Sequence, residues 1–377
     1  MKSITIPLGE LLVNFDNKRV PLSSRERESK KGSYPYYGAT SILSYVDEYI
    51  FDGTYILLGE DGTVINSDGS PVLQIASGKF WCNNHAHVLK NTDKVDFYFL
   101  YYLLKNCNVR SIVTGAVQPK ISQKNLNSFL VTYPEDKVIQ KKIAHILGII
   151  DSKISLNQKQ NNNLEQQAQV LIQEHIINLQ AIVPLDEFCN IFTGRKNANE
   201  FDKNGVNKFF TCGPEALSIN SYIYDGPAVI ISGNGAYTGR TRFYNGRFDL
   251  YQRTYACTLK EKVNSNYIYL LYPLLKMVLE KKLMGGTHGS AIPYIVMNDI
   301  AKFEVPFDKE IFDKISPACK AIIDKIQTNE QENEKLAEMR DALLPKLMSG
   351  EIDVSKVKIN EILDDSLTDK LSFTGEE

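Results

Sequence analysis

Two stretches of the chain, 172 residues apart, carry the same seven-residue repeat of apolar side chains. The first repeat runs from Ile143 to Leu171 and the second from Ile315 to Leu343. Between Pro134 and Leu171 the offset reproduces 13 of 38 residues identically, whereas unrelated sequence would reproduce roughly two. A duplicated repeat of this kind predicts two long helices that pack together as a coiled coil.

Each apolar repeat is interrupted by two asparagines at the same place. They are Asn157 and Asn161 in the first copy, and Asn329 and Asn333 in the second. The second helix must run back along the first to bury both seams, so an antiparallel pair is expected. In that register Asn157 meets Asn333 and Asn161 meets Asn329. Buried amides at seam positions fix the register, because a slipped pairing leaves them without partners. The alternative is that the polar run 157–167 is a solvated stretch.

Prolines mark the expected ends and irregularities of these helices. Pro134 and Pro306 precede the two repeats, where proline begins a helix at little cost. Pro317 and Pro345 lie within the second repeat and predict that this helix is kinked or broken. Arg340 places a charged side chain in the second seam.

The segments outside the two repeats share one plan but differ in side chains. Both contain short β-branched and aromatic runs separated by turn signals, followed by an aromatic-rich helical stretch at 96–105 or 267–282. The pattern predicts two α/β modules with largely antiparallel sheets, joined by two long helices in an antiparallel coiled coil. The expected order is module 1 (residues 1–133), a first helix (134–179), module 2 (180–305), a second helix (306–350) and an acidic tail (351–377).

Charge is unevenly distributed along the 377 residues. The net charge is −2, but the tail from Glu351 onward holds eight acidic and three basic residues, so the rest of the chain is mildly basic. Binding to nucleic acid by bulk electrostatics is therefore excluded, and any such binding must be local and shared with a partner. The six cysteines form no CxxC pair, no leader segment is evident, and no apolar run approaches 18 residues. We expect a cytoplasmic protein without a membrane partner.

The most basic stretch of the chain, residues 16–31, leads directly into an aromatic segment, residues 34–37. Cationic loops beside aromatic residues bind phosphates and stack on bases, although a solvated surface loop is the alternative. In module 2, Arg240 and Arg242 alternate and so share a strand face, where guanidinium groups suit phosphates or guanine edges. The candidate DNA-binding residues are Lys18, Arg19, Arg25, Arg27, Lys30, Lys31, Tyr36, Lys120, Arg195, Lys196, Arg240 and Arg242.

The sequence offers little support for a metal site or for catalysis. His85 and His87 share one strand face and Cys82 lies nearby, but no second cysteine or neighbouring carboxylate completes a ligand set. Strand packing is the preferred interpretation, and no metal is expected. The glycines of residues 233–239 miss the dinucleotide-binding spacing, and neither a phosphate-binding loop nor an amino-methyltransferase motif is present. We expect no catalysis and no cofactor in this chain.

The alternation of duplicated modules with duplicated helices resembles the specificity subunit of type I restriction-modification enzymes. The likeness extends from Pro7 to about Ile352 and includes the motif at 343–352 and two Gly-to-Pro loops at 115–119 and 289–293. In that family each module is a target-recognition domain for one half of a bipartite site in double-stranded DNA, and the helices dock methyltransferase subunits. The resemblance implies S-adenosylmethionine in the methyltransferase partner, and ATP with Mg²⁺ in a restriction and translocase partner.

Two other functions compete with this interpretation. The first is a non-catalytic scaffold whose two modules bind proteins, with the coiled coil as a spacer. The basic and aromatic segment 18–37 favours DNA over protein as the ligand. The second, a self-contained nuclease or methyltransferase, is the least consistent with the sequence because the catalytic motifs are missing.

Overall fold

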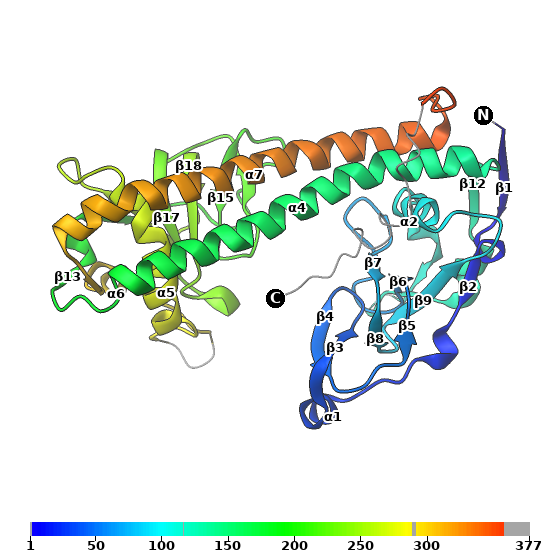
Figure 1. Ribbon diagram of the computed structural model, residues 1–377, viewed down its shortest axis with the longest axis horizontal. Helices are drawn as coiled ribbons and strands as arrows, with labels where there is room; N and C mark the ends of the chain where they lie inside the picture. The colour runs from blue at the N-terminus through cyan, green and yellow to red at the C-terminus, as the bar shows by residue number, and fades with distance from the viewer. Residues whose placement is uncertain (1, 116, 289–291, 358–377) are drawn as a thin grey trace. The chain divides into compact units, whose positions relative to one another are not determined.

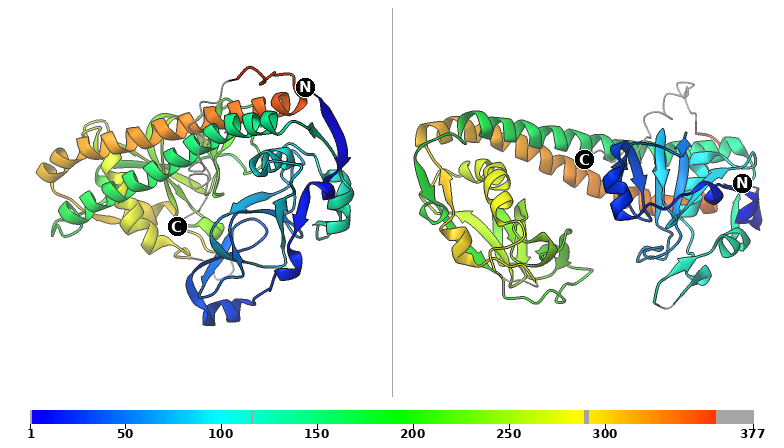
Figure 2. Two further views of the ribbon diagram at one scale, coloured as in Figure 1. Left: turned by 45° about the vertical axis from the view of Figure 1, so that its right-hand side comes forward. Right: turned by 90° about the horizontal axis from the view of Figure 1, so that it is seen from below.

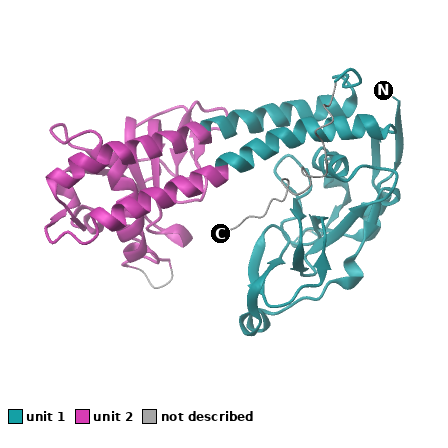
Figure 3. Ribbon diagram, in the orientation of Figure 1, with its two compact units in different colours: residues 1–157, 331–377 teal, residues 158–330 magenta. Residues whose placement is uncertain are grey.

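The computed structural model describes residues 2–115, 117–288 and 292–357. The chain forms two compact units, residues 1–157 with 331–377 and residues 158–330 (Figure 3). Each unit contains one module and one part of both long helices. Most of the acidic tail and parts of both Gly-to-Pro loops lie outside the described residues.

The duplicated repeats form the two long helices α4 (Lys137–His175) and α7 (Lys309–Ser349). They lie side by side and antiparallel, which confirms the predicted coiled coil (Figures 1 and 2). In contrast to the expected break, α7 continues without interruption through Pro317 and Pro345. Buried side chains adjoin both prolines, among them Ile315 and Leu344. We attribute the continuity to this packing, which offsets a proline cost of about 3 kcal/mol.

The C-terminus of α7 closes with the motif identified in the sequence. Gly350 adopts a left-handed backbone with φ of 78°, which glycine tolerates without steric cost. The Ile352 amide then donates to the Lys346 carbonyl at 3.1 Å. This bond satisfies a carbonyl at the helix end that has no partner within the helix.

Module 1 is built from two four-stranded sheets and two two-stranded pairs, β1-β12 and β10-β11. The sheets have the orders β2-β9-β6-β7 and β4-β3-β8-β5, and β1 pairs with β12 to bring the two ends of the module together. Only β3 and β8 are parallel among these described pairs. The strands are β1 (Ser3–Pro7), β2 (Leu12–Asn14), β3 (Lys31–Tyr37), β4 (Ile42–Val46), β5 (Phe51–Asp52), β6 (Tyr55–Gly59), β7 (Leu73–Ala76), β8 (Lys79–Cys82), β9 (Ala86–Asn91), β10 (Val113–Thr114), β11 (Lys120–Ile121) and β12 (Leu130–Pro134), and the helices are α1 (Ser24–Ser29), α2 (Phe97–Lys105) and α3 (Gln123–Ser128).

Module 2 joins its main strands into one six-stranded sheet of order β14-β19-β17-β18-β15-β16. Here β13 and β20 bring the ends of the module together, and β15 and β18 are the parallel pair among the described strands. Both modules are thus α/β with largely antiparallel sheets, as predicted. The elements are β13 (Ile182–Pro184), β14 (Cys189–Thr193), β15 (Asn207–Phe210), β16 (Leu217–Ile219), β17 (Tyr224–Ser232), β18 (Thr241–Leu250), β19 (Thr254–Leu259), β20 (Glu304–Pro306), α5 (Tyr267–Leu283) and α6 (Met297–Ala301).

The aromatic-rich helix of each module packs against the long helices. In module 1, α2 shares one hydrophobic core with Leu147 of α4 and Leu347 of α7. In module 2, α5 shares a core with Ile172 of α4 and Ile323 of α7. Each module is therefore fixed to its own part of the helix pair by buried apolar side chains, whose burial stabilises it by roughly 25 cal/mol per Å².

Candidate nucleic-acid interface

Each module brings three chain segments together in an arrangement that we call its apex. Apex 1 consists of residues 60–62, 83–85 and 119–121, and apex 2 consists of residues 233–235, 251–253 and 293–295. Three main-chain hydrogen bonds recur in both. They are Glu60 N to His85 O (2.8 Å), Ile121 N to Glu60 O (2.9 Å) and Gly62 N to Pro119 O (3.0 Å) in module 1, and Gly233 N to Arg253 O (2.8 Å), Ile295 N to Gly233 O (2.9 Å) and Gly235 N to Pro293 O (3.1 Å) in module 2.

The two apexes therefore share a backbone but present different side chains. An isolated bridge joins Asp61 to Lys120 in apex 1, and its counterpart joins Asn234 to Tyr294 in apex 2. The Gly-to-Pro loops noted in the sequence contribute the third segment of each apex. Duplicated backbones with diverged side chains are what two readers of different sequences require, because base edges are distinguished by side-chain hydrogen bonds.

Much of the basic segment of module 1 is engaged within the protein. Ser23 caps α1: its hydroxyl accepts from the Glu26 amide, and the Ser23 amide donates to the Glu26 carboxylate. This reciprocal arrangement satisfies two amides that have no partner within the helix. Arg27 donates to the Leu22 carbonyl at 2.8 Å and lies over the ring of Tyr36 at 5.2 Å. Tyr36 itself is fully buried, and its hydroxyl accepts from the Leu22 amide. It is therefore placed to support the segment and not to stack on a base.

The lysines at the end of this segment pair with carboxylates. Lys30 lies 2.7 Å from Glu48, and Lys31 lies 3.3 Å from Glu28. Such exposed pairs are weak, typically below about 1 kcal/mol, so the largely exposed Lys31 can turn to a phosphate at little cost, whereas Lys30 is held between Asp47 and Glu48. Lys18 and Arg25 are exposed and form no ion pair among the described residues; Lys18 lies over the Phe15 ring.

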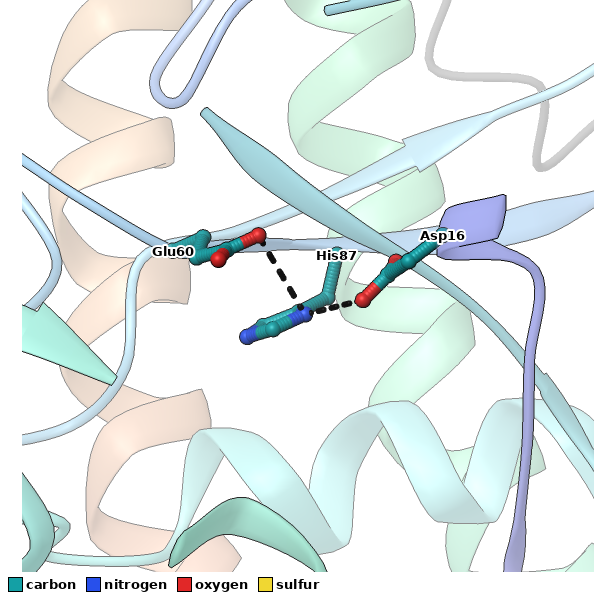
Figure 4. Close-up of side chains that lie close together, drawn as sticks. All are labelled: Asp16, Glu60 and His87. Carbon is teal, nitrogen blue, oxygen red and sulfur yellow. Dashed lines mark hydrogen bonds and ion pairs between the residues drawn. The ribbon is translucent and has the colours of Figure 1, made fainter. Parts of the chain in front are cut away.

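Arg19 and Lys120 belong to a cluster of charged side chains at apex 1. The Nδ1 atom of His87 lies 2.6 Å from Asp16 Oδ2 and 3.7 Å from Glu60 Oε2 (Figure 4). Glu60 also binds Arg19 Nη1 at 2.6 Å and Lys120 Nζ at 3.1 Å. The sequence interpretation missed the two carboxylates because they lie far from His87 along the chain.

Both ring nitrogens of His87 lie within hydrogen-bonding distance of an oxygen. Nδ1 faces the carboxylate of Asp16, and Nε2 lies 2.8 Å from the Ile121 carbonyl. Burial alone would raise the pKa of Asp16, but its bonds with His87, Val88 and Asn14 hold that pKa below its usual value. Burial would also raise the pKa of Glu60. Its interactions with Arg19, His87 and Lys120 outweigh the effect of burial, so the pKa of Glu60 lies below its usual value.

Asp16, Glu60 and His87 place three potential metal-ligand atoms within 4.8 Å of one another. These atoms already bind cationic partners inside the protein, since Arg19 contacts both carboxylates. A metal ion would have to displace that guanidinium from both carboxylates. The geometry therefore fits a charge network that joins β9 to the segments carrying Asp16 and Glu60.

In module 2, Arg240 and Arg242 hold a loop by its main-chain carbonyls. Arg242 donates to Thr211 O at 2.7 Å and to Gly213 O at 3.2 Å, while Arg240 reaches Pro214 O at 3.4 Å. Neither forms an ion pair with a carboxylate in the part of the chain described. Burial, followed by the charge of Arg240, lowers the pKa of Arg242 to about 10. The two guanidinium groups therefore leave uncompensated positive charge beside apex 2.

The second basic pair of module 2 lies on the loop after β14. Arg195 is exposed, and Lys196 lies 3.7 Å from Glu200. The Lys196 carbonyl accepts from the amide of Gln252 at 2.9 Å. The structure thus brings this pair next to apex 2. In the same way Arg19 lies next to apex 1, where its Nη1 atom is 3.4 Å from the Asn84 carbonyl.

The four seam asparagines are joined in pairs by side-chain hydrogen bonds. Asn157 donates to Asn333 Oδ1 at 2.9 Å in one unit, and Asn329 donates to Asn161 Oδ1 at 2.7 Å in the other. Asn157 and Asn329 occupy duplicated positions, and both are buried. Their own Oδ1 atoms lack a hydrogen-bond partner among the described residues, which is a cost that an apolar seam would not carry.

Comparison with known proteins gives this duplicated architecture a class. The family described as the type I restriction modification DNA specificity domain matches residues 5–166 and again 180–338. These two matches cover most of the chain, and they define a protein with two DNA-specificity domains. The chain belongs to the type I restriction-modification DNA specificity family.

Similar proteins include specificity subunits from bacteria and archaea. A type I restriction enzyme specificity subunit of Haemophilus influenzae is 26% identical over 352 residues, covering 85% of this chain and 87% of its own. The EcoDI specificity subunit of Escherichia coli is 33% identical over 175 residues, covering 45% of this chain and 38% of its own. The solved S subunit from M. genitalium has the same fold, with a TM-score of 0.56, 18% identity, and 92% and 96% of the two chains covered. In the described residues, no helix is both long and apolar enough to cross a bilayer.

Proposed function

We propose that this chain is the DNA-specificity subunit of a type I restriction-modification complex, in which each module reads one half of a bipartite site. The observation that carries this proposal is the pair of apexes. They repeat the same main-chain hydrogen bonds but display different polar side chains. Two recognition domains with the same backbone and different side chains suit a DNA target with two unlike halves.

Phosphate contacts fall to the cations that remain at least partly exposed. In module 1 these are Lys18, Arg25, Lys31 and Lys120, and in module 2 Arg195, Lys196 and Arg240. Arg19, Arg27, Tyr36 and Arg242 instead support the loops that carry them, because their polar groups are already bonded within the protein. Lys30 is held by Asp47 and Glu48. Such contacts position a protein on DNA without selecting a sequence.

The helix pair serves as the spacer between the two readers and as the docking surface for methyltransferase subunits. The 39 residues of α4 span about 58 Å at 1.5 Å per residue. Away from its seam, α4 exposes Ile149, Leu156 and Val170, with 51%, 62% and 53% of each side chain accessible. Exposed apolar side chains at multiples of seven residues form a stripe that a partner helix can cover.

Catalysis is assigned to the partners of this chain. A methyltransferase subunit would supply S-adenosylmethionine and methylate adenine, and a restriction subunit would supply ATP-dependent, Mg²⁺-dependent translocation and cleavage in the cytoplasm. The mild charge of the chain supports such sharing, since its net charge of −2 leaves much of the phosphate contact to other subunits.

Methylome sequencing of cells that express the chain with its methyltransferase partner tests the proposal. The expected result is methylated adenine within one asymmetric motif of two short halves separated by unspecified bases. Cells that express the methyltransferase subunit alone are the control and should lack this motif. A contiguous or palindromic motif, or the same methylation without the chain, would overturn the proposal.

A further inference from the structure

The same tight turn closes each apex. In module 1 it is formed by residues 83–85 between β8 and β9, and in module 2 by residues 251–253 between β18 and β19. The Asn83 amide donates to the Tyr37 carbonyl at 3.1 Å, and the Tyr251 amide donates to the Phe210 carbonyl at 3.0 Å. In both modules the bond ties the turn to the strand that pairs in parallel with the one before it.

Both turns are held by main-chain hydrogen bonds at their first residue and at their last. The carbonyls of His85 and Arg253 accept the apex bonds from Glu60 and Gly233 at 2.8 Å. The side chain of Asn83 is buried and accepts from the His85 amide at 2.9 Å. A main chain restrained at both ends holds its side chains in a defined direction, which recognition of a base edge requires.

The side chains at the tips of the turns are exposed and differ between the modules. Asn84 and His85 occupy the tip in module 1, and Gln252 and Arg253 occupy it in module 2. Among the described residues the side chains of Asn84 and Arg253 have no hydrogen-bond partner. His85 Nδ1 bonds to Asp61, and no hydrogen bond engages its Nε2 among the described residues. Gln252 Nε2 donates to Asn197 Oδ1 at 3.4 Å. Because this exposed contact is long, the Gln252 amide can also turn to a ligand.

Their chemistry matches base edges. The amides of glutamine and asparagine pair with adenine through a donor and an acceptor, and the guanidinium of arginine pairs with two acceptors of guanine. Cations flank both turns: Lys120 pairs with Glu60, whose amide donates to the His85 carbonyl, and the Lys196 carbonyl accepts from the Gln252 amide. Flanking cations that grip phosphates would bring the tips against a groove.

We infer that these two turns are the base-reading elements of the chain, with Asn84 and His85 reading for module 1 and Gln252 and Arg253 reading for module 2. The inference rests on the proposed function and adds to it the residues that determine specificity. The duplication is its main support, because the backbone of the turn is held alike in both modules while its exposed side chains have changed.

The complex of the full chain with its methyltransferase partner provides the test. Arg253→Ala and Gln252→Ala should each relax selectivity at one or two adjacent bases of the module 2 half-site by roughly 5- to 150-fold. The half-site of module 1 should stay intact. Asn84→Ala should have the reciprocal effect. Arg247→Ala is the matched control, because Arg247 lies on β18, is exposed and pairs with Asp225; it should leave both half-sites unchanged.

Methylome sequencing separates the outcomes. If the wild-type complex methylates a bipartite motif and Arg253→Ala, Gln252→Ala and Asn84→Ala leave that motif unchanged at wild-type rates, the turns are not readers although the proposed function stands. If the wild-type complex methylates no bipartite motif, both proposals fall. Where a variant abolishes methylation, competition binding to duplexes with single base changes decides. Lost discrimination within one half-site supports the inference, and equal weakening against every duplex overturns it.

Discussion

Asp151 of α4 accepts a hydrogen bond from Arg340 of α7 at 2.7 Å, and this pair has no counterpart in the other copy of the repeat. The duplication offset of 172 relates Asp151 to Ile323 and Arg340 to Ala168, which are both buried and apolar. Asp151 also accepts from the hydroxyl of Tyr102 on α2 at 2.7 Å. Module 1 is therefore joined to the helix pair by a buried ionic contact as well as by its apolar core.

Replacing Arg340 by methionine should lower the free energy of unfolding of the full chain by about 3 kcal/mol, because the buried Asp151 carboxylate loses its cation. Adding Asp151→Ile, the residue found at the duplicated position, should restore much of that loss. Chemical denaturation measures both effects. Arg247→Met, which removes an exposed pair, is the control and should change little. If the Arg340→Met variant were as stable as the wild type, the Asp151–Arg340 pair would not stabilise the fold.

The seam asparagines should trade stability for register. The double variant Asn157→Leu, Asn333→Leu removes a buried amide whose Oδ1 has no partner in the described part of the chain. We expect the chain to become more stable by about 1–3 kcal/mol and to pair its helices in more than one register. Thermal unfolding measures the first effect, and spin-label distances between α4 and α7 measure the second. A more stable chain with one unchanged distance would argue against a role in register.

The charge network at apex 1 should make module 1 sensitive to acid. The pKa of Asp16 lies below its ordinary value of 3.8 in the folded chain, so its contribution is complete above that value and is lost as the pH falls through the lowered folded pKa. Glu60 behaves in the same way relative to 4.5. Unfolding followed between about pH 2 and 5 should show stability falling toward acid. Asp16→Asn should flatten this dependence; an unchanged pH profile in that variant would contradict the assignment.

Lys18 should contribute to DNA affinity without contributing to specificity. It is exposed and has no ion pair among the described residues. Lys18→Ala should therefore weaken binding to all DNA duplexes alike and reduce the salt dependence of binding by about one counterion. Lys30→Ala is the matched control, because Lys30 is held by Glu48, and it should change the slope less. Binding isotherms of the methyltransferase complex at several salt concentrations measure both. Equal slopes for the two variants would remove Lys18 from the interface.

Sequence patterns anticipated those features that depend on local spacing. The seven-residue repeat identifies which asparagines face one another, and hydrogen bonds join those pairs. The charge network escaped notice because 71 residues separate Asp16 from His87. The roles of Tyr36 and Arg242 also depend on distant main chain, namely the Leu22 amide and the Thr211 carbonyl. Composition alone marks such side chains as candidate ligands for DNA, whereas the fold assigns them to loops.

The uninterrupted course of α7 could likewise not be predicted from the sequence. Pro317 predicts an interruption from local propensity, but Ile315 and Cys319 on either side are buried in the core of module 2. Tertiary burial of this kind overrides the intrinsic preference of a single residue. Residue types around a proline do not reveal how deeply they will be buried.

Exchange of module 2 tests the central claim, that two independent readers share one chain. Residues 180–305 would be replaced by the equivalent segment of another specificity subunit, and the methylated motif of the resulting complex would be determined by sequencing. One half of the motif should change, while the other half and the spacing between them should be retained. Changes in both halves, or in neither, would contradict it.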